Sequence, residues 1–117
     1  MYGPADIRSV RIAGVRYPPL VATLSTHVLD TATGRGAAGI AVAVERDGAE
    51  VARGVTDVDG RVRELASSLA AGRYRLVFDL ADRFFRRVAL DVELRADGHY
   101  HVPLLVSPFG VTSYRGS

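Results

Sequence analysis

The stretch VALDVELR, residues 88–95, alternates strictly between two sets of side chains, one of which is wholly apolar. Successive side chains on a strand point to opposite faces, so this alternation predicts a strand with one buried face. The apolar set is Val88, Leu90, Val92 and Leu94, and the opposite set is Ala89, Asp91, Glu93 and Arg95.

Two other stretches repeat this pattern, GIAVAVER at 39–46 and RYRLVFDL at 73–80. Turn sequences separate the apolar runs, since glycine supplies the positive φ that tight turns require. Short strands with frequent turns predict an all-β sandwich or barrel. The expected turns are TATGRG at 31–36, Asp47-Gly48, Asp59-Gly60 and Asp97-Gly98. The expected core faces are Ile40, Val42 and Val44 on the first stretch, and Tyr74, Leu76, Phe78 and Leu80 on the second.

One segment is open to two interpretations. In ELASSLAAG, residues 64–72, Leu65 and Leu69 are four apart and Gly72 could cap a helix, but a loop fits equally well. Residues 1–20 contain three prolines and little periodicity, apart from a possible short strand at 10–15, so we expect an N-terminal extension of uncertain order. Residues 21–117 then form one domain.

Composition narrows the class of protein. A chain of 117 residues, 48% hydrophobic and 24% charged, is typical of one globular domain. The absence of cysteine excludes disulfides and a thiolate nucleophile. The net charge is only +2 and the arginines are scattered among acidic residues, which disfavours nucleic acid as a partner. No apolar run reaches the roughly 18 residues of a membrane span, and the start does not resemble a signal peptide, so we expect a cytoplasmic protein.

The three histidines are the first candidates for chemistry, because histidine changes charge near neutral pH. His27 lies in LSTHVLD, residues 24–30, and shares a strand face with Ser25 and Leu29; by itself such a histidine is more often structural. In HYHVPLLVSP, residues 99–108, His99 and His101 share a face, while the alternate residues from Tyr100 onward form an apolar core face. Pro103 and Leu105 join the two histidines, and this mixture predicts a second buried surface, either a subunit interface or a pocket.

Metal binding is disfavoured. A zinc site needs three or four protein ligands, and beyond His99 and His101 only His27 and remote carboxylates remain. The DVDG segment at 57–60 is a poor calcium loop, because its twelfth position is Ser68 rather than an acid. There is no nucleophile elbow, phosphate-binding loop or dinucleotide fingerprint. The residues alone therefore leave two classes open, a hydrolase and a binding module.

Three segments closely resemble the signatures of 5-hydroxyisourate hydrolases in the transthyretin-like family: residues 24–46, residues 56–65 (TDVDGRVREL), and residues 99–117, which end in Tyr-Arg-Gly-Ser. The resemblance implies hydrolysis of 5-hydroxyisourate to 2-oxo-4-hydroxy-4-carboxy-5-ureidoimidazoline in urate degradation, without metal or cofactor. By position it implies the catalytic residues His27, Arg61 and His101, and the substrate-binding residues His99, Tyr114, Arg115, Gly116 and Ser117.

The resemblance also implies a fold and an assembly. The fold is a transthyretin-like (prealbumin-like) sandwich of two four-stranded antiparallel sheets, assembled as a homotetramer, a dimer of dimers, with its substrate grooves between dimers. The segment at 84–89 is shorter than in the family, so we expect its short helix to be reduced or absent, and Val111 replaces an aromatic residue. The alternative is a non-catalytic, transthyretin-like small-molecule binding protein, which would share the fold and lack the His, Arg, His set.

Overall fold

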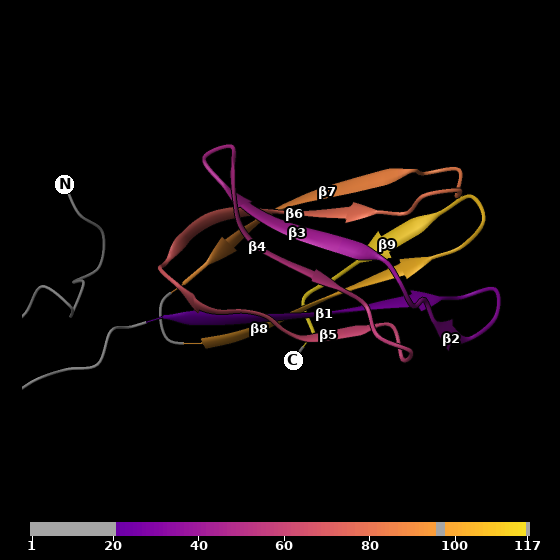
Figure 1. Ribbon diagram of the computed structural model, residues 1–117, viewed down its shortest axis with the longest axis horizontal. Helices are drawn as coiled ribbons and strands as arrows, with labels where there is room; N and C mark the ends of the chain where they lie inside the picture. Colours follow the sequence, from indigo (N-terminus) through magenta and orange to yellow (C-terminus); the bar gives the residue numbers. More distant parts are fainter. Residues whose placement is uncertain (1–20, 96–97, 117) are drawn as a thin grey trace, which may run out of the picture.

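The computed structural model describes residues 21–95 and 98–116, and within them the chain forms nine strands and no helix (Figure 1). The all-β prediction is confirmed. The predicted extension at 1–20, its possible strand at 10–15, and part of the predicted turn at Asp97-Gly98 lie outside the described residues. The strands are β1 (Ala22–Asp30), β2 (Arg35–Gly36), β3 (Ala41–Arg46), β4 (Ala49–Val55), β5 (Arg61–Leu69), β6 (Gly72–Asp79), β7 (Arg87–Leu94), β8 (Gly98–Val106) and β9 (Val111–Ser113).

The strands form two sheets that pack face to face. One sheet is β4-β3-β6-β7, antiparallel throughout. In the other, β8 pairs with β1 along its whole length, and β9 follows beyond β8. The opposite edge of β1 is shared by β5 and the two-residue β2, so this sheet has five strands in four positions. The sandwich is as predicted, with two differences of detail: one sheet has five strands instead of four, and β1 and β8 run parallel.

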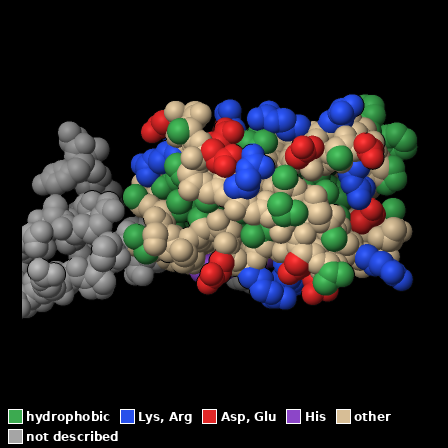
Figure 2. All heavy atoms as spheres, in the orientation of Figure 1, with side chains coloured by type: hydrophobic (Ala, Val, Ile, Leu, Met, Phe, Trp, Pro, Cys, Tyr) green, Lys and Arg blue, Asp and Glu red, His purple; other side chains and the backbone are tan. Residues whose placement is uncertain are grey.

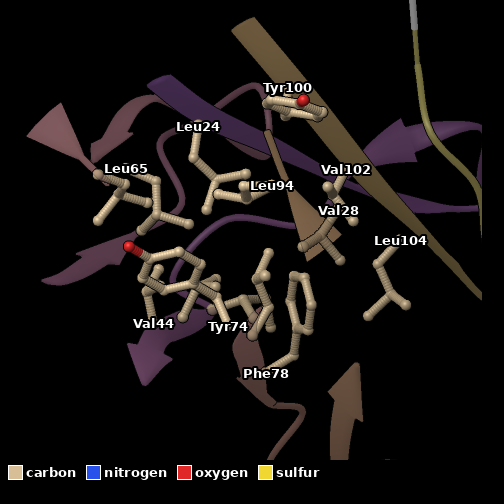
Figure 3. Packing of buried hydrophobic residues seen from close by; sticks show 14 of the residues in the cluster. Leu24, Val28, Val44, Leu65, Tyr74, Phe78, Leu94, Tyr100, Val102 and Leu104 are labelled. Carbon is tan, nitrogen blue, oxygen red and sulfur yellow. The ribbon is translucent and has the colours of Figure 1, made fainter. Parts of the chain in front are cut away.

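The core lies between the sheets and is built by strand alternation (Figure 3). Every second side chain of β1, β6 and β8 is buried in it, as predicted for residues 73–80 and 99–108. The apolar face of β7 is only half-buried up to Val92, because β7 is the edge strand of its sheet. Large side chains with no exposed surface include Leu24, Val28, Leu76, Phe78 and Leu104.

The segment ELASSLAAG is neither helix nor loop over most of its length, since β5 continues to Leu69. A spacing of four is an even number, so Leu65 and Leu69 share a face of a strand as well as a face of a helix. Two register shifts in the pairing of β5 with β1 accommodate extra residues on β5, and both leucines reach the core.

The connection between β6 and β7 is a short turn, and the helix that was expected to be reduced or absent there does not form. The Arg86 carbonyl accepts a hydrogen bond from the Leu80 amide, which closes the turn. Arg83 within it donates to Asp30 at the end of β1, with 2.9 Å between nitrogen and oxygen. This hydrogen bond is the main reason that the pKa of Asp30 lies below its usual value. The ion pair thus attaches the shortened connection to the other sheet.

Basic and acidic side chains are interspersed over the surface, and Figure 2 shows them mixed on the face in view. On the sheet that contains β6 and β7, Arg75 pairs with Asp91 at 2.7 Å and Arg73 with Glu93 at 3.5 Å. Within the described residues, no helix is long and apolar enough to cross a membrane.

Candidate active site

Three neighbouring strands carry the predicted polar residues to one face of a sheet. Arg61 of β5 lies opposite His27 of β1, and on the other side of β1 His101 of β8 lies opposite Ser25. One pair further along, His99 lies opposite Thr23. The alternate residues of β1 and β8 fill the core, so strand periodicity places these polar groups on the outer face.

A cavity of about 210 Å³ opens on this face. The predicted site residues His101, Arg61 and His99 line it together. His27 lies beside the cavity, opposite Arg61, and is not among its lining residues. The complete lining is Ser25, Thr26, Arg61, Arg63, His99 and His101.

Two hydroxyl groups of β1 hold the imidazoles of β8. The Ser25 oxygen lies 2.8 Å from Nδ1 of His101 and 2.9 Å from Nε2 of His99. The Thr23 oxygen lies 2.6 Å from Nδ1 of His99. Of the four ring nitrogens, only Nε2 of His101 has no partner among these hydroxyls, so that nitrogen is available for chemistry.

His101 is held in its neutral form. Burial disfavours the charged imidazolium, and the positive charge of Arg61 adds to this, as do His27 and His99, so that the pKa of His101 lies below its usual value. A histidine with a lowered pKa is unprotonated at neutral pH and can accept a proton. The geometry and the charge therefore give His101 the properties of a general base.

His27 is oriented by the turn before β5. Its Nε2 lies 3.0 Å from the Asp59 carbonyl oxygen, and since a carbonyl only accepts, Nε2 carries a hydrogen. Gly60 allows this approach, because its φ is +78° and an added Cβ would collide with the Val28 carbonyl oxygen. A neutral His27 consequently has its lone pair at Nδ1.

The start of β5, which carries Arg61, is fixed by the same turn. The Asp57 carboxylate accepts hydrogen bonds from the amides of Asp59 at 2.9 Å and of Arg61 at 3.0 Å. The Arg61 amide is the first cause of a lowered pKa at Asp57, so this carboxylate stays charged at neutral pH. The turn therefore fixes the backbone position from which the Arg61 side chain extends.

The C-terminal residues divide between two places. The Gly116 amide donates to the His101 carbonyl at 2.7 Å, and an added Cβ on Gly116 would lie 2.7 Å from the His101 ring. Tyr114 and Arg115 instead line a separate cavity of about 410 Å³ beside β7, where the guanidinium of Arg115 lies 4.3 Å from the ring centre of Tyr100. The structure thus brings Gly116 to His101 but not Tyr114 or Arg115. Ser117 lies outside the described residues.

Four residues that line or support the cavity were not predicted as part of a site: Thr23, Ser25, Thr26 and Arg63. Alternation along β1 could have identified Thr23 and Ser25, which share the face of His27. Within residues 21–95 and 98–116, no three histidine, aspartate or glutamate side chains are grouped to hold a metal ion.

Comparison with known proteins gives consistent matches. The model of the HIUase/Transthyretin family matches residues 24–116. A 5-hydroxyisourate hydrolase of Caulobacter vibrioides is 42% identical over 112 aligned positions, covering 80% of this chain and 97% of that protein. One from Deinococcus radiodurans is 42% identical over 113 positions, covering 80% and 95%.

Two solved structures are also similar. The structure of Klebsiella pneumoniae 5-hydroxyisourate hydrolase has a TM-score of 0.75 and 38% identity, covering 82% of this chain and 99% of that one. Transthyretin from Sparus aurata has a TM-score of 0.72 and 29% identity, covering 80% and 95%.

Proposed function

Since this chain belongs to the HIUase/Transthyretin family, we propose that it hydrolyses 5-hydroxyisourate at the cavity formed by β5, β1 and β8. The reaction is a step of urate degradation and gives 2-oxo-4-hydroxy-4-carboxy-5-ureidoimidazoline. The observation that carries the assignment to this cavity is the meeting of a neutral imidazole, His101, with a guanidinium, Arg61. A general base and a fixed cation are what the hydrolysis of a cyclic amide requires.

In the proposed mechanism, Nε2 of His101 takes a proton from water as the water oxygen bonds to a ring carbonyl carbon. The carbonyl oxygen becomes an oxyanion, which Arg61 stabilises through its planar pair of N–H donors. The carbon–nitrogen bond of the ring then breaks, and the proton on His101 passes to the leaving nitrogen. The ring opens to a carboxylic acid, which keeps the second hydrogen of the water and loses it to solvent as it ionises to a carboxylate, and the base is regenerated.

His27 and the tail complete the proposal. His27, opposite Arg61 in the sheet, assists His101 in activating water. His99, Tyr114, Arg115, Gly116 and Ser117 are proposed to bind substrate. Gly116 supports this through its contact with the His101 ring, whereas Tyr114 and Arg115 would have to reach the site from the cavity beside β7, in this chain or across a subunit contact.

We also propose a homotetramer, a dimer of dimers, located in the cytoplasm. Exposed aromatic side chains support an assembly: Phe84 and Phe109 come from different loops, with ring centres 5.9 Å apart, and Phe85 packs on Phe84 at 5.0 Å. Figure 2 shows hydrophobic side chains gathered at the right-hand end, where these loops lie in Figure 1. Light scattering should give four times the 12.6 kDa chain mass, and cell fractionation tests the location.

The activity is tested by following the ultraviolet decay of freshly generated 5-hydroxyisourate with and without the protein. We expect a decay that accelerates in proportion to protein concentration. The binding-module alternative predicts a saturable complex with no acceleration. That result in the wild-type protein would contradict the proposed function.

A further inference from the structure

One hydroxyl group contacts both histidines of β8, and its chemistry limits how they can be protonated. Ser25 has a single hydrogen to donate, and its oxygen lies within 2.9 Å of His99 Nε2 and 2.8 Å of His101 Nδ1. If one of these bonds is donated by Ser25, Ser25 must accept the other. The tautomers of the two imidazoles are therefore coupled through this oxygen.

The proposed role of His101 fixes the direction in which the hydrogen bonds from His101 through Ser25 to His99 are donated. A base that acts through Nε2 carries its hydrogen on Nδ1 and donates it to Ser25. Ser25 then donates to Nε2 of His99, so a neutral His99 carries its hydrogen on Nδ1 and donates it to Thr23, 2.6 Å away. Thr23 and Ser25 thus prepare His101 as a base, the task that a buried carboxylate performs in a catalytic triad.

The surroundings of His101 oppose a positive charge on it. Arg61 and Arg63 face the cavity from β5, His27 is adjacent on β1, and the tail contributes the backbone of Gly116. Among the described residues that line the cavity there is no carboxylate to neutralise an imidazolium. His99 is more exposed to water than His101, so a charge there keeps more of its hydration.

We propose that Ser25 is a positioning residue that relays the charge, so that His99 carries the proton gained when His101 activates water. As Nε2 of His101 takes the water proton, the Nδ1–H bond of His101 breaks and a new O–H bond forms on Ser25. The original O–H bond of Ser25 breaks, and a new N–H bond forms at Nε2 of His99. His101 ends neutral with its hydrogen on Nε2, and His99 ends as an imidazolium that donates to both hydroxyls. The reverse transfer recharges His101 as its Nε2 proton leaves for the ring nitrogen.

This proposal rests on the proposed function of His101, but one test of it needs no substrate. Nitrogen-15 NMR distinguishes the ring tautomers, and we expect neutral His101 in the wild-type protein to carry its hydrogen on Nδ1. In Ser25→Ala this preference should disappear, and in Ser25→Thr, which keeps a hydroxyl, it should return. An unchanged His101 tautomer in folded Ser25→Ala would overturn the positioning role, whether or not the protein has the proposed activity.

The relay itself is tested by kinetics. We expect Ser25→Ala and His99→Gln each to lower kcat by about 10- to 100-fold with little change in KM, because the step assists only proton transfer. Ser25→Thr should recover most of kcat. The rate in mixtures of H₂O and D₂O should follow a curve in the wild-type protein, since several protons move together, and a straight line in Ser25→Ala.

The matched control is Ser113→Ala. Ser113 also donates its hydroxyl to β8, at the Pro103 carbonyl 2.8 Å away, but it lies opposite the core residue Leu104 and not on the histidine face. We expect wild-type kcat and a curved isotope dependence. If His99→Gln, shown to be folded, keeps wild-type kcat and the curved dependence, His99 does not receive the charge and the relay is wrong.

Discussion

The guanidinium of Arg61 has two effects on the cavity that are separable by substitution. Burial lowers the pKa of His101, and the positive charge of Arg61 lowers it further because it repels a proton on the imidazole. The planar set of donors on the guanidinium is suited to hold an oxyanion, which a point charge such as an ammonium does less well. Arginine or lysine at this position would thus keep His101 unprotonated. Only arginine would also bind the developing oxyanion through two hydrogen bonds.

Substituting Arg61 separates these effects. In Arg61→Ala we expect kcat/KM to fall by about 10²- to 10³-fold through lost charge stabilisation. The acid limb of the pH profile should move to higher pH, because removing the positive charge raises the pKa of His101 toward that of an ordinary histidine. Arg61→Lys is the matched control, in which the acid limb should stay near its wild-type position while activity remains reduced. An acid limb that does not move in Arg61→Ala would contradict the electrostatic role.

The histidines themselves give a direct test of their assigned roles. His101→Ala and His27→Ala should each lower turnover by about 10²- to 10⁴-fold, the range for loss of a general acid or base. Circular dichroism establishes that each variant is folded. Near-normal turnover in a folded variant would mean that the residue has been assigned wrongly.

Activity should not depend on a metal. Four of the six histidine ring nitrogens are already bonded, to Ser25 and Thr23 at His99, to Ser25 at Nδ1 of His101 and to the Asp59 carbonyl at His27. Nε2 of His101 and Nδ1 of His27 remain, and two ligands are fewer than the three or four of a zinc site. We therefore expect hydroxyisourate decay to be unchanged after exhaustive chelation. Loss of activity that added zinc restores would show that these bonds give way to a metal.

At the scale of single residues, the structure groups some of the predicted residues, His99, His101 and Arg61, at one cavity and adds the hydroxyls that connect the histidines. His27, His99 and His101 stand out because histidine is rare in this chain, whereas Arg61 was identified only through the family resemblance. Ser25 and Thr23 do not stand out, since a serine or threonine on a strand is common. Their role depends on the register of β1 against β8, which only the structure gives.

At the scale of elements, the tail after β9 joins the sheet again through a single bridge from Gly116 to His101. The tail adds no side chain to the core, because Tyr114 and Arg115 lie at the edge of the core and are exposed. The contact of Arg115 with the Tyr100 ring adds only about 0.5–1 kcal/mol at such a site. The tail therefore contributes more to the cavity than to the stability of the fold.

Removing residues 114–117 tests this division. We expect a folded protein with little activity, because the deletion opens one side of His101 to water, and a higher local dielectric weakens the stabilisation that Arg61 provides. Size exclusion and circular dichroism establish the fold, and hydroxyisourate decay measures the loss. A folded truncation with full activity would place the active site elsewhere, since an ordinary exposed tail tolerates deletion.

Most elements were predictable because alternation and turn chemistry agree. At Asp47-Gly48 both residues have positive φ, as the Asp-Gly pair predicted for a two-residue hairpin. The failure was β5, where bulges and a spacing of four conceal the strand period. Parallel pairing of β1 with β8 was also not predictable, because it depends on how distant segments pack rather than on local pattern.

At the scale of the whole molecule, stability should fall in two stages on acidification. The pKa of His101 is lower in the folded chain than the value of about 6.5 expected when unfolded, so the unfolded state binds more protons as the pH drops below that value. Four carboxyl groups have pKa values that hydrogen bonds keep low, and the donors are Arg83, Arg53, backbone amides and Arg75, in the order of the carboxyls named next. The stability that these charged carboxylates contribute is lost as the pH falls below the ordinary carboxyl range. These carboxyls are Asp30, Glu50, Asp57 and Asp91.

Thermal unfolding measured between about pH 7.5 and about pH 3 tests this expectation. We expect Tm to fall first below about pH 6.5 and again below about pH 4. His101→Gln should remove the first stage and leave the second, because it deletes only the imidazole. If the first decrease in Tm persists unchanged in this variant, a group other than His101 causes it.

The parallel pairing of β1 with β8 also bears on how the protein is made. Ser25 and His101 meet across a separation of 76 residues, so the cavity stays incomplete until β8 has been synthesised. Until β8 leaves the ribosome, β1 presents an unpaired edge, and the hydroxyls of Thr23 and Ser25 have no imidazoles to bind. Pairings this distant in sequence close slowly, typically over milliseconds to seconds. The face that carries the proposed active site is thus among the last parts of the molecule to form, and a chain released before β8 is complete would be open to pairing with other strands.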